Sequence, residues 1–536
     1  MRLDDEKENG SDAVMKGKNN SNKLLPLPSS LSGQDDFVLY FRRWLVLGSF
    51  GLLSMSSAWI WMTFSPIAYP VANLWHVPIN AVDALAGIYF YVYVPGSFIS
   101  LSLVVNHLGL HRGLMIGGVL NATGALIRLC YMDNYRMVYL GTFLAATAQT
   151  FTLSTPPLIA GSWFGASERT TATALGVLAN QLGTATGLGA TIFVDFAAKM
   201  DSTNYNRDYE DNITVSESLF EPASTTTSTS SFTIHSIRMQ QYLTLQATVA
   251  VVAFVLVVLL GGDQPPTPPS MATMLARYKH SDQPNSKSGK KTNDDQVPLL
   301  GNQTVIVTYG EDRDADCTNV YQEEPIGLSY LSSILHVFSK PAYFSFILSF
   351  GLSVGIYYTI PTFLSQLLPS TWTSRSVGWL GVMYQLMGVL GSFFCGLLVD
   401  WSQKHRLVCL SILFCSVLAL AIYTFAEYAI INQMWAQTLT NSFIIVGVMG
   451  SGWTLAAWNT LGLEFGTALT YPADEAAVAG VLECAAELLG FVFVTLGGYL
   501  MASDQAVAFV GLLAVMAMIS FLLLFANKAE SKRPYC

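Results

Sequence analysis

Charged side chains are scarce in this sequence. Asp, Glu, Lys and Arg make up 12% of the 536 residues, about half the share found in soluble proteins. Apolar residues make up 52%, and the mean hydropathy is +0.42. This composition excludes a soluble multidomain enzyme and a disordered chain. The 36 acidic residues outnumber the 27 basic ones, so nothing points to nucleic acid as a partner. The chain is therefore expected to be a polytopic membrane protein.

Motifs for metal, disulfide or nucleotide chemistry are also missing. The seven Cys residues are scattered and form no Cys-x-x-Cys pair, so neither metal nor disulfides are expected to organise the fold. No Gly-x-x-x-x-Gly-Lys-[Ser/Thr] string occurs, so ATP does not drive the protein directly. No His/Asp constellation within an apolar segment supports an enzyme. The sequence thus predicts neither a cofactor nor a catalytic centre.

Long apolar segments dominate what remains. A membrane-spanning helix needs about 20 mostly apolar residues, and a lipid-exposed backbone must satisfy its own hydrogen bonds, which favours helices. Twelve segments qualify, near residues 44–67, 84–106, 114–131, 137–160, 171–195, 242–262, 342–365, 378–399, 407–427, 437–461, 475–498 and 505–526.

Polar stretches divide the twelve segments into two groups of six. We expect a disordered tail at 1–38, a first half at 39–262, a disordered linker at 263–327, a second half at 328–527 and a short tail at 528–536. Residues 197–240 form a further polar loop between spans five and six. Two six-helix halves joined by a long loop are the plan of the major facilitator superfamily, an all-α membrane fold with a site between its halves.

The distribution of Lys and Arg predicts the orientation. Most basic residues lie on one side if both termini are cytoplasmic. The loop with Asn212-Ile213-Thr214 then faces outward, where Asn212 could carry a glycan.

The loop after span eight resembles a conformational latch. It runs from Asp400 to Lys404 and Arg406, and an acid at a helix end beside bases can pair across the bundle. The alternative is that Lys404 and Arg406 only set the topology.

Seven strings of the sequence together carry a family resemblance: Leu39–Leu47, Val82–Tyr89, Asn121–Arg128, Trp163–Ala174, Asn180–Gly183, Asp263–Ser270 and Glu464–Glu475. In this order they resemble the feline leukaemia virus subgroup C receptor-related transporters (solute carrier family 49). The string Trp163–Ala174 also resembles the family's lysosomal "disrupted in renal carcinoma" branch.

The resemblance implies a carrier of a small organic solute, with choline or ethanolamine as the favoured cargo. The family's choline-binding tryptophan, tyrosine and glutamine match Trp61, Tyr358 and Gln149. Aromatic faces suit a quaternary ammonium, which has no hydrogen to donate. Spans one and seven open the two halves, so Trp61 and Tyr358 should face each other across the cavity. Trp59 and Tyr357 are expected to pack elsewhere.

Two acids in span eleven depart from the family pattern, in which those positions are neutral amides. Glu483 and Glu487 lie one helical turn apart and share a face. Each costs about 2.5–3.5 kcal/mol to insert into a membrane. They are expected to attract a cationic solute or to couple transport to protons, or else to form a structural pair. Glu487, deeper in the span, is expected to face the cavity. The amides Asn180 and Gln181 have Gly and Thr neighbours and are expected to serve close helix packing.

The remaining predictions concern cellular context and rival functions. Asp295, Leu299 and Leu300 fit a sorting signal read by an adaptor, which would place the carrier in endosomes or lysosomes. Without such sorting, the plasma membrane is the favoured location. The protein is expected to be a monomer. The alternatives are haem export, a lysosomal pyridoxine-type carrier and a receptor or sensor that does not transport. Haem export is disfavoured because the seven His residues fall at span ends or in loops.

Overall fold

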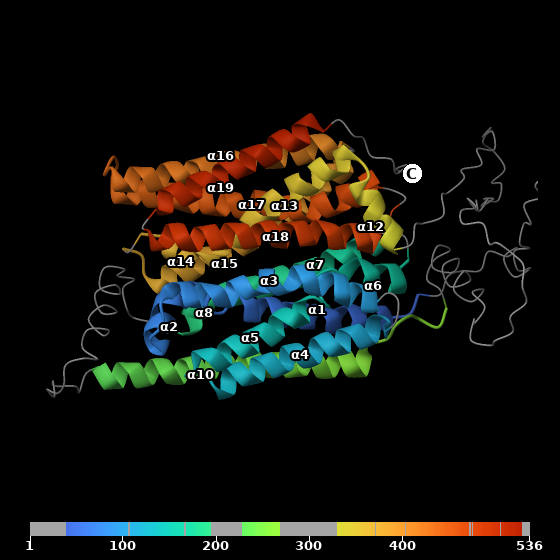
Figure 1. Ribbon diagram of the computed structural model, residues 1–536, viewed down its shortest axis with the longest axis horizontal. Coiled ribbons are helices and arrows are strands. Elements are labelled where there is room, and N and C mark those ends of the chain that lie inside the picture. Colours follow the sequence, from blue (N-terminus) through green and yellow to red (C-terminus); the bar gives the residue numbers. More distant parts are fainter. Residues whose placement is uncertain are drawn as a thin grey trace, which may run out of the picture.

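The fold is a bundle of long helices, seen side-on in Figure 1. The structure is a computed structural model that describes residues 39–104, 108–165, 168–194, 228–267, 330–369, 371–402, 404–470, 473, 475–503 and 505–527. The first half contains α1 (Arg42–Trp61), η2 (Ser65–Ile67), α2 (Ala68–Trp75), α3 (Ile79–Leu103), α4 (Leu110–Cys130), α5 (Tyr135–Gln149), α6 (Pro156–Trp163), α7 (Arg169–Leu188), α8 (Ala190–Phe193) and α10 (Ser228–Leu260). The second half contains α12 (Tyr330–Phe338), α13 (Pro341–Thr362), α14 (Leu364–Leu367), α15 (Ser374–Ser402), α16 (His405–Ile431), α17 (Gln437–Thr470), α18 (Glu475–Ala502) and α19 (Ala506–Ala526).

Ten helical stretches of the described chain are long and apolar enough to cross a membrane. The other two predicted spans are also helical. One is divided between α5 and α6, and the other comprises α7 and α8, where Thr, Asn and Gln lower the hydropathy. The two six-helix groups predicted from the sequence are therefore all present as helices, and the chain is an integral multi-pass membrane protein.

The fourth predicted span is interrupted midway along its length. Helix α5 ends at Gln149 and α6 begins only at Pro156. Proline has no N–H to continue the helical hydrogen bonding. Within the break, the hydroxyls of Thr150 and Thr155 donate to the carbonyl oxygens of Thr147 and Phe151 at 2.8 and 2.7 Å. The break leaves Gln149 at a helix end, where its side chain can reach across to the other half.

The predicted loop at 197–240 is wrong at its C-terminal end. Helix α10 begins at Ser228, well before the apolar segment at 242. No Gly or Pro lies between Pro222 and Gly261, so nothing in the backbone ends the helix where the side chains become polar. Composition located the membrane segment, but the helix extends past it.

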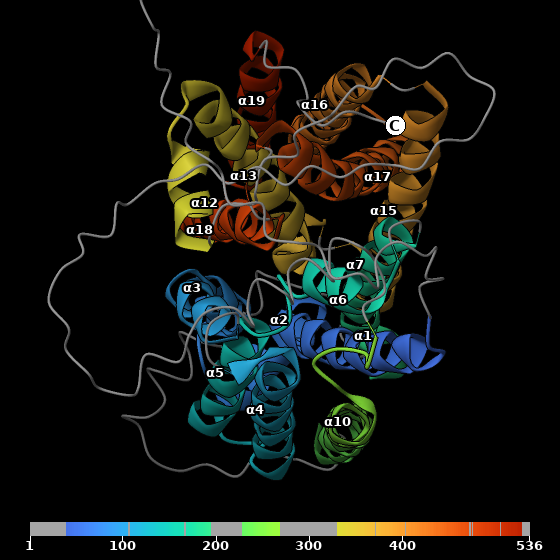
Figure 2. The ribbon, with the colours of Figure 1, turned by 90° about the vertical axis from the view of Figure 1, so that its right-hand side faces the viewer.

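The two halves are related by a repeated packing scheme. Viewed from one end, the first half (blue to green) and the second half (yellow to red) lie on opposite sides of the bundle (Figure 2). Within the halves, α1 packs on α7 and α13 packs on α18; between them, α3 packs on α18 and α7 packs on α15. The first helices of the two halves, α1 and α13, therefore lie next to the interface, and the site is built there.

Small residues bring the helices of the interface close together. A Cβ atom on Gly355 of α13 would lie 2.9 Å from the backbone nitrogen of Gly490 in α18. A side chain there would therefore have to push two helices apart. This contact places Tyr358, one turn beyond Gly355, beside the acidic face of α18.

The close approach gives a stability prediction. Gly355→Ala should lower the melting temperature of the purified protein in detergent, because overpacking costs about 1–3 kcal/mol. The matched control is Gly396→Ala in α15, where an added Cβ meets nothing within 4 Å. There the better helix propensity of Ala should leave the melting temperature unchanged or raised. Equal melting temperatures for the two variants would contradict the packing argument.

Candidate functional site

A cavity of about 380 Å³ lies between the halves. Its lining comes from α1, α6, α7, α13, α15, α17 and α18, and the residues used below are Trp61, Asn180, Gln181, Tyr358, Asn459, Glu464 and Glu483. Glu464 is exposed, whereas Trp61 and Tyr358 are buried. The cavity therefore opens near Glu464 and ends at the two aromatic rings.

Trp61 and Tyr358 meet at the closed end of the cavity. Their ring centroids are 5.6 Å apart and their planes lie at 84°. The residues come from α1 and α13, so they face each other across the halves as the sequence predicted. Because the rings are nearly perpendicular, their two faces form the walls of a corner. A cation in that corner can lie within about 6 Å of both centroids, the range of a cation–π contact.

Further contacts fix the indole of Trp61. Its Nε1 donates to the carbonyl oxygen of Ala86 in α3 at 3.2 Å. The rings of Phe90 and Tyr89 lie 5.8 and 6.1 Å from it. The orientation of Trp61 is thus set by α3 before any ligand arrives.

A carboxylate holds the ring of Tyr358. The Tyr358 hydroxyl donates to Oε2 of Glu483 at 3.2 Å, and Nδ2 of Asn459 donates to the same hydroxyl at 3.4 Å. Glu483 and Asn459 also line the cavity. An acidic side chain therefore lies directly beside the aromatic corner.

The sequence-based choice between the two acids is wrong on one point. Glu483 lines the cavity, while Glu487 is not among the lining residues. Glu487 is instead buried against the first half, where its Oε1 accepts a 3.5 Å hydrogen bond from Nε2 of Gln149. The Glu487 carboxyl meets Gln149 of α5, whereas the Glu483 carboxyl one turn earlier meets the Tyr358 hydroxyl at the cavity wall. Gln149 is likewise engaged behind the cavity wall.

Two further expectations from the sequence need correction. Asn180 and Gln181 do lie where α7 packs closely on α1, but both also line the cavity. Neither polar atom of the Gln181 side chain has a hydrogen-bond partner, although the residue is buried. Tyr357 also lines the cavity and donates to Oε1 of Gln385, rather than packing elsewhere. Trp59, by contrast, packs away from the cavity as expected, and its Nε1 donates to the Tyr242 hydroxyl at 2.7 Å.

Hydrogen bonds between the halves close the bundle beyond the aromatic pair. Ser365 Oγ donates to the Ser65 carbonyl oxygen at 2.8 Å, and Nε2 of Gln366 donates to Oδ1 of Asp83 at 2.7 Å. Asp83 is only 7% exposed. We call these two contacts the inter-half gate. The sequence offered no sign of it except Asp83, a lone acid in an apolar span.

Comparisons with known proteins agree with this architecture. The family profile described as Major Facilitator Superfamily matches residues 226–479. The crystal structure of a bacterial homolog of the human lysosomal transporter Spinster, in an inward-facing and unoccupied conformation, superposes with a TM-score of 0.57 at 11% identity. That match covers 93% of this chain and all of the other. A bacterial homologue of the iron transporter ferroportin in an outward-facing state gives 0.53 at 12% identity, over 92% of this chain and 100% of the other.

Relatives found by sequence have a higher percentage identity to this chain than these two structures. The chain is 26% identical over 500 residues to choline/ethanolamine transporter flvcr2b of Danio rerio, which covers 92% of this chain and 85% of that protein. It is 27% identical over 462 residues to choline/ethanolamine transporter FLVCR1 of Mus musculus, covering 84% and 69%.

The chain is a membrane transporter of the major facilitator superfamily. The resemblance to the feline leukaemia virus subgroup C receptor-related transporters, inferred from short strings, is confirmed. A superfamily transporter works by alternating access, in which the two halves rock around a central site. The described conformation is open at the end near Glu464 and closed by the inter-half gate.

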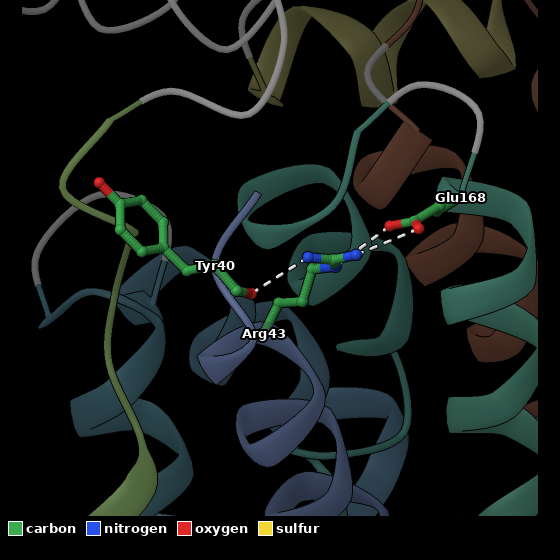
Figure 3. Close-up of polar contacts among 3 residues, drawn as sticks. All are labelled: Tyr40, Arg43 and Glu168. Carbon is green, nitrogen blue, oxygen red and sulfur yellow. Dashed lines mark hydrogen bonds and ion pairs between the residues drawn. The ribbon is translucent and has the colours of Figure 1, made fainter. Parts of the chain in front are cut away.

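An ion pair within the first half connects the start of α1 to the start of α7. Arg43 at the start of α1 contacts Glu168, the residue before α7, through two nitrogen–oxygen distances of 3.1 Å (Figure 3). The third nitrogen of the Arg43 guanidinium, Nη1, donates to the Tyr40 carbonyl oxygen at 3.2 Å. Both residues stood in the strings that carried the family resemblance, but their pairing was not visible in the sequence.

The predicted latch is only partly described. Asp400 lies in the last turn of α15, and the contacts of its side chain fall outside the described part of the structure. Lys404 is exposed, and the Arg406 guanidinium donates to the Phe525 carbonyl oxygen at 3.1 Å, within its own half. The latch therefore stays a prediction. The positions of Asn212, Asp295, Leu299 and Leu300 lie outside the described residues, so their roles stay predictions too.

The inter-half gate predicts a change in accessibility. Gln366→Ala removes a hydrogen bond that contributes about 0.5–1.5 kcal/mol, which should raise the population of the opened gate about two- to tenfold. A cysteine placed at Ile67, buried in η2, should then react faster with a thiol reagent by the same factor.

The matched control for this experiment is Gln437→Ala. Gln437 donates to Thr371 at 2.9 Å inside its own half, so its loss should leave the rate at Ile67→Cys unchanged. A rate unaffected by Gln366→Ala would show that the bond does not hold the gate.

Proposed function

We propose that this transporter carries choline or a closely related organic cation, such as ethanolamine, by alternating access. Two relatives that this chain matches over most of their length are named choline/ethanolamine transporters. The observation that carries the proposal is the corner of two aromatic faces made by Trp61 and Tyr358 at the closed end of the cavity. A quaternary ammonium cannot be hydrogen-bonded, so aromatic faces are its natural receptor.

Charge supports a cation as the cargo. Glu483 lies beside the aromatic corner and is 5% exposed. A carboxylate in a low-dielectric surrounding attracts a cation more strongly than it would in water. It would oppose an anionic substrate by the same amount. An organic cation therefore suits both the aromatic corner and Glu483, whereas an anionic substrate suits neither.

Gln149 and Glu487 form the second part of the proposed site. They contact each other behind the cavity wall at 3.5 Å, which is a long hydrogen bond. In the proposal, a substrate hydroxyl takes the place of this contact when the cation enters the corner. Choline and ethanolamine both carry a hydroxyl two carbons from the nitrogen, which suits a polar pair next to the cation.

Haem is the less favoured cargo. Haem iron is usually held by His, Cys, Met or Tyr, and no His in the described part of the chain lines the cavity. A pyridoxine-type cargo would use the aromatic corner without needing a charge. A sensor would bind without moving its ligand. Uptake and binding measured side by side separate these cases.

The cellular setting is also a proposal. We infer a monomer in the plasma membrane with both termini cytoplasmic, from the distribution of basic residues. An adaptor that reads Asp295, Leu299 and Leu300 would move the carrier to endosomes or lysosomes. Alanine at Leu299 and Leu300 should then increase its abundance at the cell surface.

Removal of either aromatic ring should weaken transport. Trp61→Ala and Tyr358→Ala each delete a cation–π contact of about 2 kcal/mol, so the concentration for half-maximal choline uptake should rise roughly 30-fold. Radiolabelled choline uptake in expressing cells, normalised to surface abundance, measures this. Trp61→Phe should restore part of the affinity, because it keeps an aromatic face.

The control for these variants is Trp401→Ala. Trp401 is 85% exposed at the end of α15, so its loss should not change uptake. Undiminished uptake of choline and ethanolamine in both aromatic variants would refute the proposed site. Saturable binding without uptake would identify a sensor.

A further inference from the structure

Two buried carboxylates of α18 have no basic partner among the residues that the structure describes. Glu483 and Glu487 are 5% and 1% exposed. Glu483 accepts from the Tyr358 hydroxyl and Glu487 accepts from the Gln149 amide, and both donors are neutral. Within the described part of the chain, no Lys, Arg or His side chain contacts either carboxylate. The second oxygen of Glu487 has no hydrogen-bond partner at all.

An ionised carboxylate in this position would be strongly unfavourable. Burial of a charge without a counter-charge costs several kcal/mol even after the protein relaxes, and a group in that position binds a proton instead. A proton is the one counter-charge that the empty site can supply. The cation that the cavity is proposed to bind is the other.

We propose that Glu483 exchanges a proton for the cationic substrate, so that the carrier operates as a proton/organic-cation antiporter. This inference rests on the proposed function. When the cation enters the aromatic corner, the O–H bond of the Glu483 carboxyl breaks and the proton leaves to solvent through the cavity mouth near Glu464. The carboxylate that remains neutralises the substrate. One positive charge enters the site as one leaves, so the exchange needs no further reactant.

The geometry assigns the exchange to Glu483 rather than to Glu487. Glu483 lines the cavity and touches Tyr358, one of the two rings that receive the cation. A proton released there has a path to water, because the cavity reaches the exposed Glu464. Glu487 is behind the wall and held by Gln149. In the proposed function it meets the substrate hydroxyl and not the ammonium group, and it has no path to water through the cavity.

The neighbouring elements offer no competing counter-charge. The ionisable groups close enough to feel the charge of Glu483 are Tyr358 from α13, Tyr93 from α3, and Cys484 and Glu487 from α18 itself. Glu464 from α17 lines the same cavity. His336 of α12 lies against Tyr343 instead, and α6 and α19 contain no ionisable side chain. All the groups that face Glu483 are neutral or acidic, so a proton or the substrate must balance its charge.

The sign of the pH effect follows from the competition. A proton and the cation cannot both neutralise one carboxylate, so acid on the side from which substrate binds should weaken binding, and alkali should strengthen it. Acid on the opposite side should accelerate net uptake, because the returning carrier loads its proton there. Exchange of one monovalent cation for one proton moves no net charge, so the rate should not depend on membrane potential.

The test uses the full-length chain in proteoliposomes with radiolabelled choline or ethanolamine. The wild type should take up substrate faster when the interior is acid, at a clamped membrane potential, and should export protons, so that an internal dye reports a rise in internal pH. A potassium diffusion potential should leave its rate unchanged. Counterflow of labelled against unlabelled substrate, with no gradient, gives the baseline.

Two isosteric variants distinguish Glu483 from Glu487 as the residue that exchanges the proton. Glu483→Gln should lose the response to the pH gradient and should respond to membrane potential, because the cation then moves without a returning proton. Its counterflow should persist but should need a higher substrate concentration, because the neutralising carboxylate is lost. Glu487→Gln should keep the gradient response of the wild type, although its concentration for half-maximal uptake changes because Glu487 meets the substrate hydroxyl. Glu483→Asp should keep the gradient response in part. Purified protein that remains monodisperse shows that the variants are folded.

The outcomes separate the two proposals. Counterflow without any response to the pH gradient, or a Glu483→Gln carrier that keeps the response, overturns proton exchange and leaves the cation carrier intact. Loss of the response in Glu487→Gln, with the response kept in Glu483→Gln, would assign the exchange to Glu487 and overturn its assignment to Glu483. Absence of counterflow for both cations overturns the proposed function and this inference together.

Discussion

The contact of Trp61 with Tyr358 across the two halves is the interaction on which the site depends. It forms the floor of the cavity, and every other feature is placed relative to it. On one side lies open space down to Glu464; on the other, Ser65, Ser365, Asp83 and Gln366 hold the halves together. A rocking motion that opens the gate must therefore also separate or slide the two rings. Binding of substrate and movement of the halves thus act on the same pair of side chains.

Irregular backbone and small residues position this contact. Gly355 lets α13 approach α18 closely enough for Tyr358 to reach Glu483. Helix α5 ends at Gln149, so this side chain lies at a helix end and contacts Glu487 across the interface; α6 restarts at Pro156, which has no N–H to donate. Broken helices at membrane depth occur where they line a cavity or are buried in protein. Here the break lines the cavity through Leu153 and Ser154, and the hydroxyls of Thr150 and Thr155 donate to backbone carbonyl oxygens.

Charge is distributed by depth. Arg43 and Glu168, near the end of the bundle, form a two-point ion pair in a part-buried setting. Glu483 and Glu487, inside the bundle, have only neutral donors. The first pair stabilises one half in all conformations, because both partners belong to that half. Glu483 and Glu487 lie where the halves meet the cavity. Because no positive side chain in the described part of the chain neutralises them, their ionisation depends on whether a cation enters the cavity.

Composition and pattern determined much of this protein. Hydropathy alone placed the twelve helical segments, because each must satisfy its backbone within a membrane of fixed thickness. The family resemblance singled out Trp61 and Tyr358, and the equivalence of the first helices of the two halves predicted that they face each other. Only the tertiary structure decided which acid lines the cavity, that Gln181 and Tyr357 also line it, and that Asp83 meets Gln366. The physical reason is that helical periodicity tells which residues share a face. Which face meets open space depends on how closely neighbouring helices approach, and those neighbours are far away in the sequence.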